Sequence, residues 1–162
     1  MGRSVFYSFH FDKDVMRVQQ VRNIGAIDDN APVSPNDWEQ VKRGGDKAIE
    51  KWIQDNMNYR QCVVVLVGAE TDSRPWVQYE IKKGWEDGRG VMGVHIHNLK
   101  CPRTGTSRKG VNPFARFTFR DGRNLSNIVK CYDPSPLFPN QSIADNLEGW
   151  VEEAIVIRKN FK

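Results

Sequence analysis

The carboxylate of Glu80 follows the indole of Trp76 by four residues in the run Arg74-Pro75-Trp76-Val77-Gln78-Tyr79-Glu80-Ile81. Proline is typical of the first position of a helix, and in such a helix Trp76, Glu80 and Gly84 follow one another on one side. Because Gly84 has no side chain, we expect open space over Glu80, and the nearby helix start favours an anion. The spacing therefore indicates room for a ligand, although a glutamate on a helix flank is also commonly a solvated residue or the partner of a lysine.

A second group of polar and aromatic residues follows the first predicted strand. Residues 4–9 alternate as a strand does, and Ser8-Phe9-His10-Phe11-Asp12 comes at its carboxyl end. Ser8 and His10 can hydrogen-bond a ligand there, and Phe6, Phe9 and Trp76 can stack on a ring or exclude water. In open parallel sheets, ligands bind outside the carboxyl ends of the strands, so this stretch should meet residues 68–80.

The elements that would position these residues alternate along the chain. The first half of the chain predicts a strand over 4–9, a helix from Asp12 that buries Val15, Val18 and Val21, a helix over 36–57 and a strand over 62–67. A helix from Pro75 and a strand over 91–96 follow, and a helix runs from Ser142, where a capping box begins, to the end. Between them, short strands over 117–119 and 128–132 could be joined as a hairpin by Asp121-Gly122.

Such a succession predicts an α/β fold with a mostly parallel sheet, helices on both faces and a C-terminal helix, flavodoxin-like in outline. The continuous apolar run Cys62–Val67 is typical of the central strand. No repeat or linker is visible, which favours one domain over residues 1–162. A receiver domain is disfavoured, because Val67-Gly68-Ala69 offers no aspartate to accept phosphate.

Composition narrows the class of protein. Hydrophobic residues make up 39% and charged residues 27%, as in ordinary globular domains. With neither a signal-like apolar segment nor one that could span a bilayer, we expect a cytoplasmic protein. The three cysteines form no C-x-x-C pair, so we expect neither a metal nor a redox site, and Cys62 should be buried packing.

Positive charge is concentrated between Asn98 and Arg123. Seven basic residues stand there against the single acid Asp121, in a stretch rich in Gly, Pro, Thr and Asn. We interpret it as a long basic loop, either a solvated face or a phosphate contact. Nucleic-acid binding is disfavoured, because the phenylalanines that could stack bases also fit a strand pattern.

Several of these segments, read together, resemble a known family. Over residues 3–115 the pattern is similar to TIR domains with a W-x-x-x-E helix, and more closely to the ThsB-type TIR-like proteins of the Thoeris anti-phage system. The matching segments are Val5-Phe6-Tyr7-Ser8-Phe9-His10, Val21-Arg22-Asn23, Trp38-Glu39, Trp76-Val77-Gln78-Tyr79-Glu80-Ile81, Gly93-Val94-His95-Ile96 and Asn112-Pro113-Phe114.

The resemblance implies that Glu80 is the catalytic glutamate of an NAD-consuming enzyme, with Phe6, Ser8, Phe9, His10 and Trp76 around the substrate. NAD is then substrate and no cofactor or metal is needed. A neutral nicotinamide leaves without a strong acid, whereas the oxocarbenium-like ribose needs a negative charge nearby. The resemblance further implies an ADP-ribose-derived signal, often cyclic, that activates an effector protein, a phage component as trigger, and a homo-oligomer as the active form.

Two other functions stay open on the sequence. A TIR-like adaptor would signal by association alone, with Glu80 a surface residue and the basic loop an interface. A nucleoside deoxyribosyltransferase-like enzyme would share the sheet architecture and also place a carboxylate at a ribose. Replacing Glu80 by Gln separates the adaptor from the enzymes, and analysis of the product separates the two enzymes.

Overall fold

The computed structural model describes residues 4–24, 28–29 and 40–161. It contains a sheet of five strands in the order β2-β1-β3-β4-β5, and all neighbouring pairs are parallel. The strands are β1 (Ser4–Ser8), β2 (Asp28–Asp29), β3 (Cys62–Val67), β4 (Gly90–His95) and β5 (Cys131–Tyr132). This order confirms the flavodoxin-like prediction, with Cys62–Val67 as the central strand.

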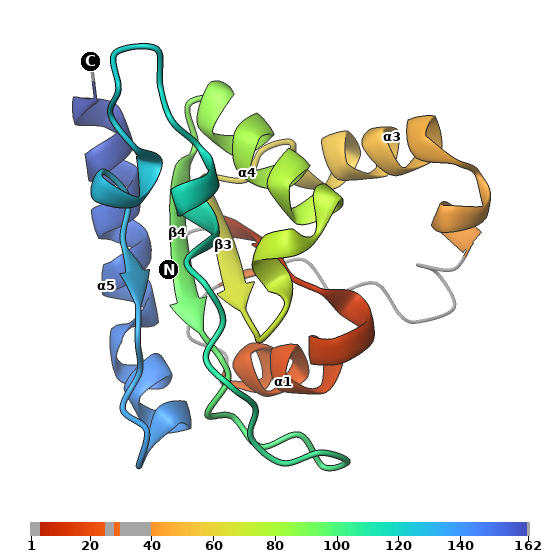
Figure 1. Cartoon of the computed structure of the whole chain (residues 1–162), viewed down its shortest axis with the longest axis vertical. Helices are drawn as coiled ribbons and strands as arrows, with labels where there is room; N and C mark the ends of the chain where they lie inside the picture. The colour runs from red at the N-terminus through yellow and green to blue at the C-terminus, as the bar shows by residue number, and fades with distance from the viewer. Residues whose placement is uncertain (1–3, 25–27, 30–39, 162) are drawn as a thin grey trace.

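Helices cover both faces of the sheet (Figure 1). They are α1 (Phe11–Asn23), α3 (Asp46–Met57), α4 (Pro75–Glu86) and α5 (Pro139–Asn160), with short 3-10 turns η1 (Thr71–Ser73), η2 (Pro113–Arg116) and η3 (Leu125–Asn127). Apolar side chains of α1 and α5 pack with Val64 and Leu66 on one face, and those of α3 and α4 pack with Val63 and Val65 on the other. The all-apolar β3 is thus buried on both sides.

The long helix predicted over 36–57 is wrong in its extent. Residues 40–43 are helical, the chain breaks at Gly44 and Gly45, and α3 begins only at Asp46. Gly45 has a φ of +84°, which a residue with a side chain rarely adopts, so the glycine pair ends one helix before the next begins. Residues 36–39 of the predicted helix lie outside the described residues.

Other boundaries shift by a few residues. Helix α1 begins at Phe11 and buries Val18 and Val21, whereas Val15 is only half-buried. Strand β4 begins one residue before the predicted 91, and α5 begins at Pro139 rather than at Ser142. In α5, proline at the first helical position prevails over the later capping-box pattern.

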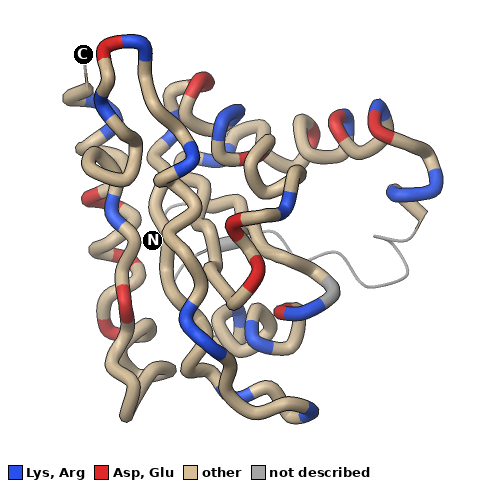
Figure 2. The backbone as a smooth tube through the Cα atoms, viewed as in Figure 1, with Lys and Arg blue, Asp and Glu red and all other residues tan. Residues whose placement is uncertain are grey.

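The segment from Asn98 to Arg123 is the predicted irregular excursion, and it runs along the length of the molecule (Figure 1). The hairpin predicted between residues 117–119 and 128–132 is wrong, because Thr118 forms a single antiparallel bridge with Asn124 around the turn at Gly122 and β5 instead pairs in parallel with β4. Basic residues are spaced along the segment rather than gathered in one place (Figure 2). Lys109 pairs with Asp133 and Arg116 with Asp72, which offsets part of the charge.

Candidate active site

Strand β1 places Ser8 on the face of the sheet that α3 and α4 cover. Successive strand residues point to opposite faces, so Phe6 and Ser8 share the face covered by α3 and α4, while Val5 packs on the other. Ser8 is completely buried. A buried hydroxyl needs a hydrogen-bond partner, and the partner here comes from α4.

Helix α4 brings Glu80 to that hydroxyl. Val77, Ile81 and Trp85 pack the helix against the sheet. Glu80 lies on the side of the helix that faces the sheet, and it is only 7% exposed. The Ser8 hydroxyl donates a hydrogen bond of 2.6 Å to Oε1 of Glu80. The prediction that residues at the end of β1 meet the helix after the central strand is thereby confirmed, and Glu80 is not a solvated flank residue.

Burial makes Glu80 an unusual acid. Loss of solvation raises its pKa from 4.5 to about 8, and the hydrogen bond from Ser8 opposes this by favouring the ionised form. A carboxyl group with a pKa in this range gains or loses a proton near neutral pH. Such a group can act as a general base, or it can become ionised when a cationic ligand binds beside it.

A cavity of about 380 Å³ opens beside the two residues, where β1 ends and α4 begins. Its lining consists of Phe9, His10, Phe11, Lys42, Ile49, Arg74, Pro75, Trp76 and Val77. Ser8 and Glu80 are not in the lining, but Ser8 directly precedes Phe9, and Glu80 lies about one turn beyond Val77. The hydrogen-bonded pair therefore lies next to the cavity rather than in it.

The predicted site residues divide between the cavity, the carboxylate and the core. Phe9, His10 and Trp76 line the cavity, and Ser8 holds Glu80. Phe6 instead lies in the core, 3% exposed, with its ring 6.3 Å from that of Trp52. The ring of Trp76 lines the cavity and makes an edge contact with the Tyr79 ring, with the two ring centres 5.4 Å apart.

The cavity carries positive charge that sequence reasoning missed. Lys42 and Arg74 both line it, and among the residues that the structure describes no acid does. Arg74 is the N-cap residue of α4, and Trp76 and Val77 belong to the first turn, whose backbone N–H groups favour anions. A basic residue directly before a helix-starting proline was the signal in the sequence that could have identified Arg74.

The expectation of open space over Gly84 is wrong. A side chain at Gly84 would place its Cβ 2.5 Å from Cγ2 of Val63 on β3. The glycine thus allows a close approach of α4 to the sheet, rather than making room for a ligand. This close approach contributes to the burial of Glu80 one turn earlier.

Other candidate groups lie apart from the cavity. Nε2 of His95 lies 3.4 Å from Sγ of Cys131, and burial lowers the pKa of His95 to about 4, so the imidazole is neutral. Cys62 is fully buried, as predicted.

Within the described residues, no group of three or more His, Cys, Asp or Glu side chains could hold a metal ion. Among those residues, too, no helix is both long and apolar enough to cross a membrane.

Comparison with known proteins finds two matches in sequence. Residues 6–101 match the family model described as Thoeris protein ThsB, TIR-like domain. The chain is also 34% identical over 165 aligned positions to a protein of Bacillus cereus (strain MSX-D12) named "Putative cyclic ADP-D-ribose synthase ThsB1", and the alignment covers 92% of this chain and 85% of that protein. The region that matches the family model contains α4, the Ser8–Glu80 pair and the last three residues of β1.

Proposed function

The chain belongs to the ThsB TIR-like family of the Thoeris defence system, and we propose that it is an enzyme that cleaves NAD and forms a cyclic ADP-ribose-derived signal. The observation that carries the proposal is the buried carboxyl of Glu80, held by Ser8 beside a basic cavity with aromatic walls. The name of the Bacillus cereus relative supports the same chemistry.

In this reaction the bond between N1 of nicotinamide and C1 of the ribose breaks, and its electron pair stays on the nitrogen. Nicotinamide leaves as a neutral base, and the ribose becomes oxocarbenium-like. The ionised Glu80 stabilises this cation, and the cation of the bound nicotinamide ring itself favours ionisation of Glu80. An internal nucleophile then bonds to C1 and gives up a proton, which a carboxylate with a pKa of about 8 can accept.

The cavity supplies groups suited to the rest of the molecule. Trp76 and Phe9 offer ring faces for stacking, and His10 offers a hydrogen bond. Lys42, Arg74 and the amino end of α4 suit the two phosphates. Because Glu80 lies behind the lining, catalysis requires side chains at this wall to move when NAD binds.

Cyclisation also requires that water be kept from the oxocarbenium ion, so that the internal nucleophile reacts first. In our proposal, assembly of several copies of the chain closes the cavity, and a phage component triggers that assembly or the accompanying movement. The product then diffuses to a partner effector protein. NAD is a substrate in this scheme, and no metal or cofactor takes part.

The test is incubation of the purified chain with NAD at high protein concentration, with and without extract from phage-infected cells. We expect release of nicotinamide together with one equivalent of a product whose mass is that of NAD less nicotinamide. A cyclic product lacks the added water of linear ADP-ribose, so its mass distinguishes the two. Intact NAD under both conditions would contradict the proposal and favour an adaptor.

A further inference from the structure

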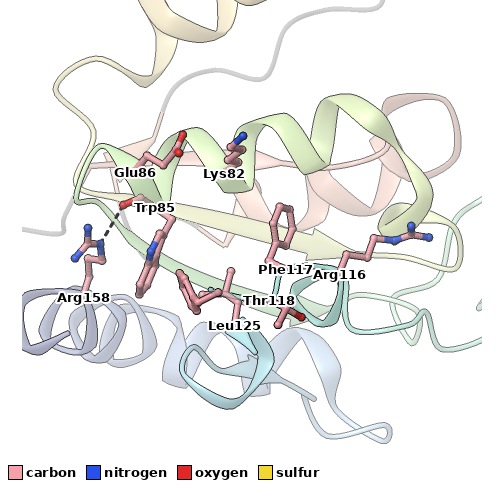
Figure 3. A pocket seen from close by; sticks show the side chains of 9 residues that line it. Lys82, Trp85, Glu86, Arg116, Phe117, Thr118, Leu125 and Arg158 are labelled. Atoms are coloured by element: carbon pink, nitrogen blue, oxygen red, sulfur yellow. Dashed lines mark hydrogen bonds between the residues drawn. The ribbon is translucent and has the colours of Figure 1, made fainter. Parts of the chain in front are cut away.

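A second and larger cavity lies at the other end of α4 (Figure 3). It measures about 610 Å³ and lies between the last turns of α4, the segment 116–125 and the last turn of α5. The cavity beside Glu80 is lined by residues 74–77 at the start of α4, whereas this one is lined by residues 82–86 near its end. The two cavities therefore share a helix but no lining residue.

Aromatic rings form the apolar part of the second cavity. Trp85, Phe117 and Phe119 all line it, and the Trp85 and Phe119 rings lie 5.9 Å apart. Trp85 is held in place from behind, because Nε of Arg158 donates a 3.0 Å hydrogen bond to its carbonyl oxygen while the guanidinium lies 4.5 Å from the ring centre. Phe117 and Phe119 are half-buried, which leaves part of each ring accessible from the cavity.

Positive charge surrounds these rings. Lys82, Arg116 and Arg158 line the cavity, against one acid, Glu86, among the described residues. Arg158 and Arg116 stand at opposite ends, and Lys82 projects from α4 between them (Figure 3). Arg116 contacts Asp72 at 3.2 Å, yet its side chain is 48% exposed, so it can also contact a bound anion.

We propose that this cavity binds a nucleotide, with the base stacked on the half-buried ring of Phe117 close to Trp85, and the phosphates held by Lys82 and Arg116. The partly exposed ring of Phe117 can stack on any base, and the cations beside it suit phosphate. A volume of about 610 Å³ lies within the range of small-molecule sites. The site goes beyond the proposed reaction, because it does not include Glu80, and it makes the molecule responsive to a second nucleotide.

The tryptophans allow the two cavities to be followed separately. In a titration of the full ¹⁵N-labelled chain with ADP, the indole N–H signal of Trp85 reports on the second cavity and that of Trp76 on the first. We expect the Trp85 signal to shift in a saturable manner, with a response to adenosine or inorganic pyrophosphate at least tenfold weaker. No Trp85 shift, or an equal affinity for pyrophosphate, would overturn the proposal.

Two exposed residues provide the variants. Lys82→Glu combined with Arg116→Glu should raise the dissociation constant seen at Trp85 at least tenfold and leave any shift at Trp76 unchanged. Arg103→Glu combined with Lys130→Glu is the matched control, since both residues are exposed cations outside the lining, and its binding curve should match that of the wild type. Equal losses in both variants would show general charge attraction and contradict a site. A silent Trp76 would count against the first cavity only.

Discussion

At the scale of single residues, the candidate active site consists of one buried carboxyl group and the hydroxyl that donates a hydrogen bond to it. Glu80 is buried at a cost in solvation, and only the Ser8 hydroxyl opposes the resulting rise in its pKa. A protein that keeps such a group sacrifices stability at neutral pH, a common feature of functional sites. Two predictions follow from the direction of this pKa shift.

Replacing Glu80 with Gln should stabilise the fold, and more so as the pH rises. The folded pKa of about 8 lies above the value of 4.5 expected for the unfolded chain, so the folded protein holds the proton more tightly and loses stability as the pH rises through this window. Glutamine does not titrate. We expect equal melting temperatures near pH 4.5 and a gain on the order of 1–3 kcal/mol at pH 8.5. A gain that is the same at both pH values would contradict a raised pKa.

Ser8→Ala removes the donor that favours the ionised form of Glu80. The pKa of Glu80 should rise further, by about one unit, because a hydrogen bond to a charged group contributes roughly 1.5–3 kcal/mol. The acidic limb of the pH profile of nicotinamide release should move to higher pH, with a fall of about tenfold in the rate at pH 7. Ser73→Ala, at an exposed serine, is the control. An unmoved acidic limb would exclude Ser8 as the residue that positions Glu80.

At the scale of elements, the sequence predicts the helices and strands whose apolar residues recur with a clear period. It does not predict the elements and breaks that depend on only two or three residues. β3 and α4 follow from continuous and periodic apolar residues. The two-residue β2, Asp28–Asp29, carries no apolar signal and was not predicted. The sequence does not predict the break at Gly44 and Gly45. The charged residues before the break also fit a helical pattern, and this pattern leads directly into the apolar stripe of α3. Burial of Glu80 depends on the fit between α4 and β3, which no local pattern contains.

That fit is tested at Gly84. Gly84→Ala would place a methyl group 2.5 Å from Val63, so α4 must shift, and we expect a loss on the order of 1–3 kcal/mol in the free energy of unfolding. Gly149→Ala on α5 is the matched control, because nothing lies within 4 Å of its added Cβ; there, alanine should gain about 0.5–1 kcal/mol through helix propensity. Urea titration of both variants measures the difference. A neutral Gly84→Ala would contradict the tight contact.

At the scale of the whole molecule, a buried ion pair ties the basic excursion to the rest of the fold. Arg17 on α1 lies 3.1 Å from Asp14, and its other nitrogens donate to the carbonyl oxygens of Leu99 and Gly105. Arg17 is 3% and Asp14 2% exposed. Burial raises the pKa of Asp14, although the charge of Arg17 opposes the rise. One guanidinium thus holds the turn between residues 101 and 105 against α1.

Arg17→Met should release this turn and leave Asp14 buried without its partner. We expect a loss of about 3–5 kcal/mol in the free energy of unfolding, the usual range when one partner of a buried pair is removed. Amide hydrogen exchange at Cys101 and Gly105, whose N–H groups now bond across the turn, should become faster. Lys13→Met, at a lysine 64% exposed on the same helix, should change stability by less than about 0.5 kcal/mol. Unchanged exchange at both amides in the arginine variant would show that the turn holds itself.

In the function that we propose, Glu80 takes part in the chemistry on NAD and does not merely help to bind it. The most direct measurement follows nicotinamide release and the Trp76 indole signal in the same samples of wild type and Glu80→Gln at saturating NAD, under conditions in which the wild type is active. We predict that NAD shifts the Trp76 signal in both proteins, and that nicotinamide release by the variant falls by at least a hundredfold. Equal release by a correctly folded Glu80→Gln protein would contradict the claim.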